Sequence, residues 1–377
     1  MNSSVVNLAM QLIKIPSVSP LDLGCQKIIY KRLKNIGFKI YFFNINNTKN
    51  IFAYRGSEGK HLNFLGHTDV VPGGDEKKWK YGAFNPFLFK NKILFGRGAS
   101  DMKGAIASMI IAAENFVTKN NSYKGKLSFL FTSDEESSGI DGIVKVVDLL
   151  KKKKQYIDYC IVGEPSSEKI LGDVIKIGRR GSITFNIKIK GISGHVAYPK
   201  YLKNPIHIII PLLNKLINYQ WDNGNKDFIP TSLQITNIFS NSLSGNVSPD
   251  ELSFQFNIRF SNIIQPKKIV LLVNKIFNNN LFDCEINWKV FALPFLNKKF
   301  ELINVVSSSI KKFNSIDTKL STSGGTSDGR FLNLLTDQIV ELGLINKTIH
   351  KYNECVKVSD LELLSFLYED IMNKLLV

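Results

Sequence analysis

The sequence predicts an α/β protein in which a smaller α+β domain is inserted into a larger one. In the first half of the chain, apolar strand-like runs alternate with helix-like runs, which is typical of a mixed, largely parallel sheet flanked by helices. Beyond residue 180 the elements instead follow the strand–helix–strand–strand–helix–strand order of a ferredoxin-like fold. A length of 377 residues also favours two domains over one.

The larger domain begins with two helices and continues into the alternating strands. Apolar residues recur at helical spacing over 5–15 and 23–36, and Pro16 and Gly37 end these helices. A long loop, 71–93, interrupts the strands, and loops of this length in compact domains are usually functional. Further strands are expected at 38–43, 51–54, 62–65, 126–132 and 159–162, with helices at 104–116 and 142–150.

The inserted domain is recognised by strands in which apolar and polar residues alternate. Residues 182–190 are the clearest case, because every second side chain is apolar, as in a half-exposed strand. The other strands are expected at 232–239, 251–260 and 284–290, and the helices at 205–219 and 266–277. The chain then returns to the larger domain through a helix at 300–313, a Gly/Ser turn at 321–328, a strand at 338–341 and a closing helix at 358–375. The predicted domains are 1–179 with 294–377, and 180–293.

The composition is that of an ordinary globular protein with a strong positive charge. Lys and Arg number 49 against 32 Asp and Glu, which gives a net charge of +17. The lysines are dispersed, however, and the densest run, 151–154, falls where a solvated turn is expected. No nucleic-acid-binding motif accompanies them, so we expect no nucleic-acid partner.

The cysteine usage and the apolar runs indicate a cytoplasmic protein. Cys25, Cys160, Cys284 and Cys355 show no CxxC spacing, which suits a reducing compartment. No signal-peptide pattern is recognised, and the most apolar stretch, 206–217, is interrupted by polar residues. We therefore expect no membrane partner.

Acidic residues and a histidine follow the carboxyl ends of three expected strands. His67 and Asp69 follow the first, Glu135 and Glu136 the second, and Glu164 the third. Ligands of such sheets bind beyond these strand ends. Because residues i and i+2 of a strand lie on one face, Asp69 can also orient the imidazole of His67.

These residues and two others form a candidate ligand set for metal ions. Asp101 follows a glycine-rich turn just before a helix, and His350 lies in a late loop. Mixed imidazole and carboxylate ligation suits zinc or cobalt, whereas magnesium and calcium prefer oxygen alone. Two ions can share the set if Asp101 bridges them and one carboxylate is bidentate. Glu135 and Glu136 are adjacent at a strand end, so one can bind metal while the other stays free as a general base. The set comprises His67, Asp101, Glu136, Glu164 and His350.

Each of these motifs alone also has an ordinary structural explanation. A single His-x-Asp pair is more often a surface histidine or a satisfied core histidine. The acidic run 134–136 equally fits a solvated turn. His61, at the start of a strand, and His207, on an expected helix, are assigned structural roles only.

Six sequence runs together resemble the co-catalytic zinc aminoacylase/carboxypeptidase family, over essentially the whole chain. The runs are GHTDVVPGGDEKKW at 66–79, GRGASDMKG at 96–104, TSDEE at 132–136, GEP at 163–165, GISGHVAYP at 191–199 and GGTSDGRF at 324–331. Three later runs, 246–260, 321–331 and 341–354, are similar to one branch of this family in particular. One departure is Leu344, where that branch is expected to have a proline, and it removes no ligand.

The resemblance implies two zinc ions per subunit, with cobalt able to replace zinc at one site. It implies five ligands: His67 and Glu164 for the first ion, Glu136 and His350 for the second, and Asp101 for both. Asp69 would support His67, and Glu135 would be the general base, so both count as catalytic. A cis peptide between Asp101 and Met102 is also expected.

The resemblance further implies a homodimer that pairs through the inserted domain. His195 matches a histidine that reaches the partner subunit's site and helps to hold the oxyanion. Five other positions match residues that grip the carboxylates and the amide of the substrate: Arg179, Asn246, Arg259, Thr326 and Asn346. Bidentate contacts with carboxylates are the physical reason for arginine at such positions.

The implied activity is hydrolysis of N-succinyl-LL-2,6-diaminopimelate, a dicarboxylic amino-acid amide, to succinate and LL-2,6-diaminopimelate. This step leads toward lysine and the cross-linking residue of peptidoglycan. Two alternatives within the family are an acetylornithine deacetylase and a dipeptidase. An alternative from another class is a non-catalytic, basic binding protein on the same scaffold, which would be expected to lack ligands.

Overall fold

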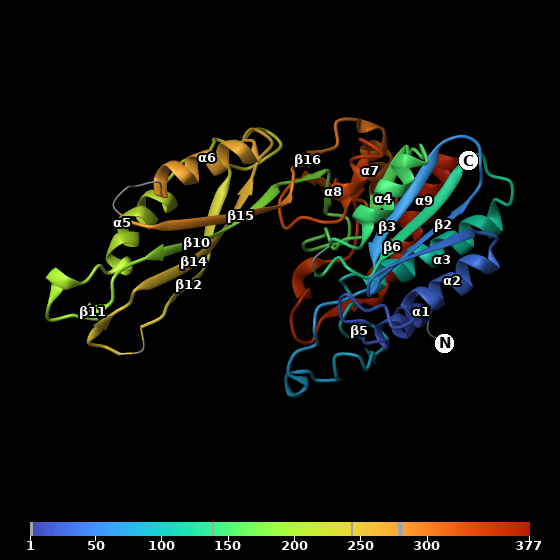
Figure 1. Cartoon of the computed structure of the whole chain (residues 1–377). Helices are drawn as coiled ribbons and strands as arrows, with labels where there is room; N and C mark the ends of the chain where they lie inside the picture. The colour runs from blue at the N-terminus through green and yellow to red at the C-terminus, as the bar shows by residue number, and fades with distance from the viewer. Residues whose placement is uncertain (1–2, 138, 243, 278–281) are drawn as a thin grey trace. The chain divides into compact units, whose positions relative to one another are not determined.

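The computed structural model describes residues 3–137, 139–242, 244–277 and 282–377, and the chain divides into two compact units (Figure 1). Unit 1 comprises Met1–Gly178, Leu296–Ser321 and Ser327–Val377, and unit 2 comprises Arg179–Phe295 with Thr322–Thr326. The sequence analysis places residues 322–326 in the larger domain, whereas the structure groups them with unit 2. One reason is a hydrogen bond of 2.8 Å that Arg179 Nη1 donates to Ser323 O.

Unit 1 is built around one mixed sheet, as the sequence predicts. Its strands lie in the order β1 (Lys39–Ile45), β2 (Thr48–Arg55), β6 (Lys126–Thr132), β3 (His61–His67), β7 (Tyr159–Val162), β18 (Ile339–Glu341), β8 (Val174–Lys176) and β17 (Lys319–Ser321). Neighbours from β6 to β18 are parallel, with Phe64 of β3 opposite both Phe129 and Ile161. The carboxyl ends of β3, β6 and β7 therefore lie at one edge, where the predicted ligands follow.

Helices cover both faces of this sheet (Figure 1). On one face α3 (Lys103–Lys119) packs against α9 (Val358–Leu376), and the core there includes Phe64, Phe129 and Tyr368. The other face is covered by α4 (Ile143–Lys152), whose buried residues recur at the spacing of one helix face. The remaining helices of unit 1 are α1 (Ser4–Ile13), α2 (Cys25–Asn35), α7 (Phe300–Asn314) and α8 (Gly329–Leu332).

Unit 2 has the predicted ferredoxin-like order. Its antiparallel sheet runs β12 (Ser232–Ser240), β14 (Glu251–Phe260), β10 (Gly181–Lys190), β15 (Cys284–Ala292). The helices α5 (Pro205–Ile217) and α6 (Pro266–Phe277) belong to the same apolar core as the alternate, inward residues of these strands. Phe185 and Phe256 are paired across β10 and β14, and their rings stack at 5.0 Å. A dimerisation role for this unit stays a proposal.

The sequence analysis missed the shortest elements. Besides β8, β17 and α8, these are β4 (Phe87–Phe89), β5 (Ile93–Phe95), β9 (Gly178–Arg179), β11 (Gly194–His195), β13 (Val247–Ser248), β16 (Phe295–Leu296), β19 (Cys355–Lys357), and the 3₁₀ turns Glu76–Lys78, Pro199–Tyr201 and Asn346–Thr348. Runs of two to four residues are too short to show a hydrophobic period. Strands β19, β5 and β4 form a separate sheet, so part of the loop expected at 71–93 is a hairpin.

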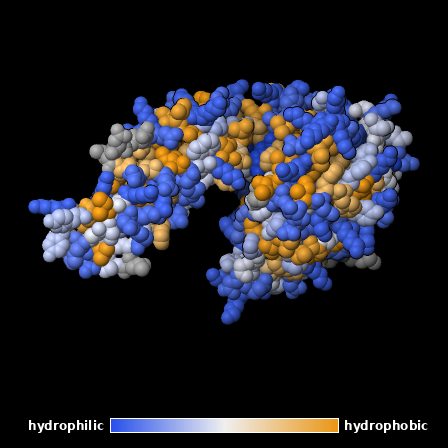
Figure 2. All heavy atoms as spheres, viewed as in Figure 1, coloured by the Kyte–Doolittle hydropathy of each residue, from blue (hydrophilic) through white to orange (hydrophobic). Residues whose placement is uncertain are grey.

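The surface agrees with the dispersed charge of the sequence. Figure 2 shows hydrophilic residues spread over the visible face of each unit, with hydrophobic residues interspersed among them. Among the helices that the structure describes, none has both the length and the apolar character needed to span a membrane.

His61, at the start of β3, is buried as a neutral side chain. Its Nδ1 lies 2.8 Å from Tyr156 O, and its Nε2 lies 2.7 Å from Ser128 Oγ. Burial lowers the pKa of His61 to about 4, and the charge of Lys126 adds to this shift. The structural role assigned to this histidine from the sequence is consistent with these contacts.

The fold should consequently lose stability as His61 becomes protonated. The pKa is lower in the folded than in the unfolded chain, so the unfolded chain binds more protons below pH 6.5. Stability from this group is present above about pH 6.5 and is lost toward pH 4, by at most about 3 kcal/mol. Urea unfolding at several pH values should show a steeper loss for the wild type than for His61→Gln. The control is the variant His207→Gln, which changes an exposed histidine. An equal loss of stability with falling pH in His61→Gln and the wild type would contradict the buried, neutral state of His61.

Candidate metal centre

The predicted ligands all lie in unit 1, at the strand ends or in loops next to them. His67 is the last residue of β3, Glu136 follows β6, and Glu164 follows β7. Gly343 helps to place Glu164, because a Cβ at Gly343 would clash with the backbone oxygen of Glu164. Asp101 precedes α3 and is joined to Met102 by a cis peptide bond, as expected.

Asp101 lies between two histidines that come from distant parts of the chain. Its Oδ1 is 3.3 Å from His67 Nε2, and its Oδ2 is 3.2 Å from His350 Nε2. Glu164 Oε1 lies 3.7 Å from His67 Nε2, and Glu136 Oε1 lies 3.0 Å from His350 Nε2. The five residues thus form two groups that share Asp101.

The atoms at the centre of this arrangement are suited to hold cations. Ligand atoms of His67, Asp101 and Glu136 lie within 4.8 Å of one another, and so do those of His67, Glu135 and Glu164. His67 Nε2 and Asp101 Oδ1 are buried, yet neither makes a hydrogen bond with the residues described. Buried polar atoms are seldom left in this state, and a metal ion would satisfy both.

Asp69 acts on the site in a different way from the one expected. His67 Nδ1 lies 2.9 Å from the backbone oxygen of Asp69 but 3.6 Å from its Oδ1. The carboxylate of Asp69 instead accepts the backbone N–H groups of Glu135, at 3.4 Å, and Glu136, at 3.0 Å. Asp69 therefore orients His67 mainly through its backbone and fixes the acidic turn with its side chain.

The electrostatics of the centre reflect an excess of carboxylates. Asp101 and Glu136 raise the pKa of His350 to about 10. Burial lowers the pKa of His67, but the carboxylates of Asp101 and Asp69 outweigh it and raise this pKa well above its usual value. Removal from water, together with the charge of Glu164, raises the pKa of Glu135 well above its usual value. Such a group of acids favours a bound cation.

The other predicted site residues are divided between the two units. Asn346 belongs to unit 1, in the turn before His350. The remaining five lie in unit 2: Arg179, His195, Asn246, Arg259 and Thr326. Burial lowers the pKa of Arg259, and the nearby charge of Arg179 lowers it further. Thr326 Oγ1 is buried without a hydrogen bond to any described residue.

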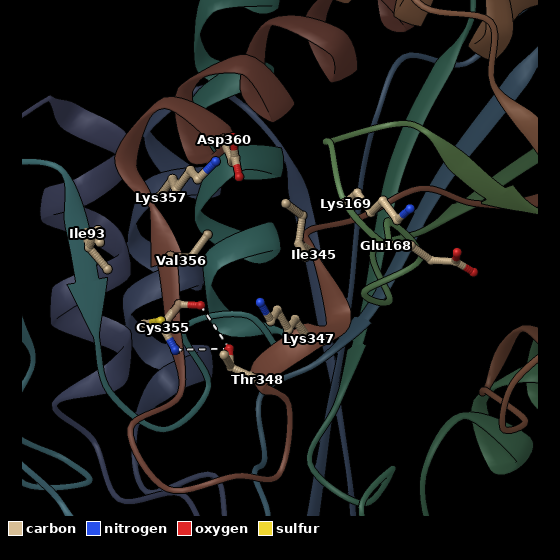
Figure 3. A pocket seen from close by; sticks show the side chains of 10 residues that line it. All are labelled: Ile93, Glu168, Lys169, Ile345, Lys347, Thr348, Cys355, Val356, Lys357 and Asp360. Atoms are coloured by element: carbon tan, nitrogen blue, oxygen red, sulfur yellow. Dashed lines mark hydrogen bonds between the residues drawn. The ribbon is translucent and has the colours of Figure 1, made fainter.

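A pocket of about 380 Å³ lies beside the turn 345–348 and contains none of the predicted site residues (Figure 3). Thr348 and Cys355, which line it, close the base of the loop that carries His350. Thr348 Oγ1 donates to Cys355 O at 3.0 Å and accepts from Cys355 N at 3.2 Å. The pocket therefore lies beside the hydrogen bonds that anchor this loop and outside the predicted site.

Three buried charged residues around the centre were given no role from the sequence. Arg97 and Glu354 form an ion pair of 2.9 Å behind Asp101. Asp328 is 4% exposed, and burial raises its pKa to about 6. Each lies within a sequence run that carried the resemblance, at 96–104, 324–331 or 341–354. Their place within these runs was the only feature of the sequence that could have indicated a role for these three residues.

Comparison with known proteins identifies the class to which this fold and this centre belong. Residues 64–374 match the model of peptidase family M20/M25/M40, and the chain belongs to this family. The resemblance seen in the sequence is thereby confirmed. An M20 family metallo-carboxypeptidase from Sulfolobus solfataricus has a similar structure, with a TM-score of 0.82 and 17% identity over 99% of both chains. A dinuclear metal binding peptidase of the M20 family from Bacillus subtilis has a TM-score of 0.69 and 17% identity over 98% of this chain and 97% of its own.

A curated relative is much more similar in sequence. The succinyl-diaminopimelate desuccinylase of Buchnera aphidicola subsp. Acyrthosiphon pisum is 55% identical over 376 residues, which cover 100% of both chains.

Proposed function

We propose that this chain is a metal-dependent amide hydrolase that converts N-succinyl-LL-2,6-diaminopimelate and water to succinate and LL-2,6-diaminopimelate. The observation that carries the substrate is the 55% identity, over full length, to a relative named succinyl-diaminopimelate desuccinylase. The observation that supports the chemistry is the position of Asp101 between His67 and His350. The product would serve lysine and diaminopimelate biosynthesis, in the cytoplasm.

The proposed cofactor is a pair of zinc ions, with cobalt able to replace one of them. His67, Asp101 and Glu164 would hold the first ion, and their mixed nitrogen and oxygen ligands suit zinc. Asp101, Glu136 and His350 would hold the second. When bound, zinc supplies Lewis acidity that polarises a carbonyl group and lowers the pKa of water.

Glu135 is proposed as the general base. Its backbone N–H is held by Asp69, and its side chain is half-buried next to the ligand group of His67 and Glu164. Glu135 takes a proton from water as the water oxygen bonds to the carbonyl carbon of the succinyl amide. It returns this proton to the amide nitrogen as the C–N bond breaks, so that atoms and charge balance.

The residues of unit 2 are proposed to bind the substrate and to complete the site in a homodimer. The substrate carries three carboxylates, and the neighbouring guanidinium groups of Arg179 and Arg259 suit such anions. Asn246, Thr326 and, from unit 1, Asn346 would bind the remaining polar groups. His195 is exposed, and its Nδ1 accepts from Ala197 N at 3.1 Å, which leaves Nε2 to donate to the developing oxyanion across the dimer.

A substrate panel tests this function. Metal-free protein is supplied with zinc in steps and assayed with N-succinyl-LL-2,6-diaminopimelate, N-acetylornithine and a dipeptide. We expect zinc-dependent release of succinate and little reaction with the other two, because the arginines and the family branch favour a substrate with several carboxylates. Preference for N-acetylornithine or the dipeptide would assign another activity of the family. No turnover at full zinc loading would support the binding-protein alternative.

A further inference from the structure

Glu354 is a buried residue whose carboxylate accepts hydrogen bonds from the backbone that leads to Asp101. It is 0% exposed. Its Oε1 accepts the backbone N–H groups of Ser100, at 2.8 Å, and Asp101, at 3.0 Å. Its Oε2 accepts the N–H of Gly98 at 3.0 Å and Arg97 Nη1 at 2.9 Å. One side chain thus fixes the whole turn that presents Asp101.

The same residue belongs to the loop that carries His350. Thr348 and Cys355 close the base of this loop through two hydrogen bonds (Figure 3), and Glu354 directly precedes Cys355 in the sequence. The backbone oxygen of Glu354 accepts the N–H of Gly96 at 3.0 Å, and Cys355 pairs with Phe95. The two ligand-bearing segments therefore run side by side and are joined at Glu354.

Arg97 compensates the charge of Glu354 and extends the connection to a third loop. Arg97 is 3% exposed and donates to Lys351 O at 3.2 Å and to Pro72 O at 3.4 Å. Its guanidinium lies 5.1 Å from the ring of Trp79. Removing one partner of a buried pair leaves the other charge uncompensated, so the arrangement is sensitive to the loss of either residue.

We propose that Glu354 is a positioning residue that sets the separation of Asp101 and His350, and thereby the affinity of the centre for its second metal ion. The inference rests on the two-metal function proposed above. Asp101 Oδ2 and His350 Nε2 are 3.2 Å apart on two loops that Glu354 joins. A carboxylate is required because all four groups around it are donors, and a glutamine amide would turn its own N–H groups toward some of them.

The test is equilibrium metal binding by Glu354→Gln. Metal-free protein is titrated with zinc against a chromophoric chelator, and bound metal is counted by elemental analysis. We expect the wild type to bind two ions, and Glu354→Gln to bind the second of them about 10- to 100-fold less tightly, as for other residues that orient ligands. Equal affinities in the variant and the wild type would overturn the inference alone. Fewer than two ions in the wild type would overturn the two-metal proposal and this inference with it.

Two further variants separate positioning from general stability. Glu369→Gln is the matched control, because it also removes a buried glutamate that forms an ion pair. Glu369 lies on α9, is 7% exposed and pairs with Lys119 at 2.6 Å. It should lower thermal stability without changing zinc affinity. Glu354→Asp keeps the charge but draws its oxygens back by one methylene, and it decides the matter if Glu354→Gln does not fold. Weakened uptake of the second ion would support the inference, and wild-type affinity would overturn it.

Discussion

Replacement of Glu135 by alanine is expected to abolish nearly all turnover while the protein keeps its metal. The side chain is half-buried beside His67 and Glu164, but it is the carboxylate that the two proposed ligand groups leave free. A positioned general base contributes on the order of 10²- to 10⁴-fold, so kcat should fall by about that factor. Steady-state assays of succinate release measure the fall in kcat. Elemental analysis of the same samples measures whether the metal is retained.

A control variant guards against a general effect of removing an acid. Glu168→Ala changes an exposed glutamate in unit 1 that is not part of the centre, and it should leave kcat unchanged. Substantial activity in Glu135→Ala would show that another group takes the proton. Loss of zinc in Glu135→Ala would instead indicate that Glu135 is a metal ligand. Its carboxylate is close enough to His67 and Glu164 for that role, because ligand atoms of the three residues lie within 4.8 Å of one another.

Replacement of Asp101 by alanine should have the largest effect on metal binding. Both of its carboxylate oxygens face the centre, one toward His67 and the other toward His350. The variant should lose tight binding of both ions, whereas His350→Ala should weaken only the second. Lewis acidity is worth several kcal/mol, so activity should fall by at least about a thousandfold. Elemental analysis after dialysis gives the stoichiometry directly.

Asp173→Asn provides the matched comparison for Asp101. Asp173 also holds a turn through its carboxylate, which accepts the N–H groups of Glu168 and Lys169 at 2.8 Å, but it takes no part in the centre. It should cost stability and leave the metal content equal to that of the wild type. An Asp101→Ala protein that still bound two zinc ions tightly would contradict the bridging role.

Much of the secondary structure could be predicted from the sequence because its signals are local. The strands 126–132 and 159–162 and the helix 266–277 have the predicted bounds. The two strands are largely apolar runs with clear ends, and the helix has apolar residues at helical spacing. The order of elements in unit 2 was sufficient to predict its ferredoxin-like sheet. The strands β8 and β17 could not be predicted, because three residues show no period and their partners are distant in sequence.

The candidate centre shows the same division. The sequence by itself determined which residues have the chemistry of metal ligands, and it placed His67, Glu136 and Glu164 beyond strand ends that a parallel sheet brings to one edge. The resemblance had already implied that His350 and Asp101 share a metal site. Only the tertiary structure decided how closely these two side chains lie, and that Asp69 holds the acidic turn with its carboxylate. It also decided that Glu354 joins the two loops behind the centre. These contacts link residues up to about 250 positions apart, and a periodicity that repeats every few residues carries no information about them.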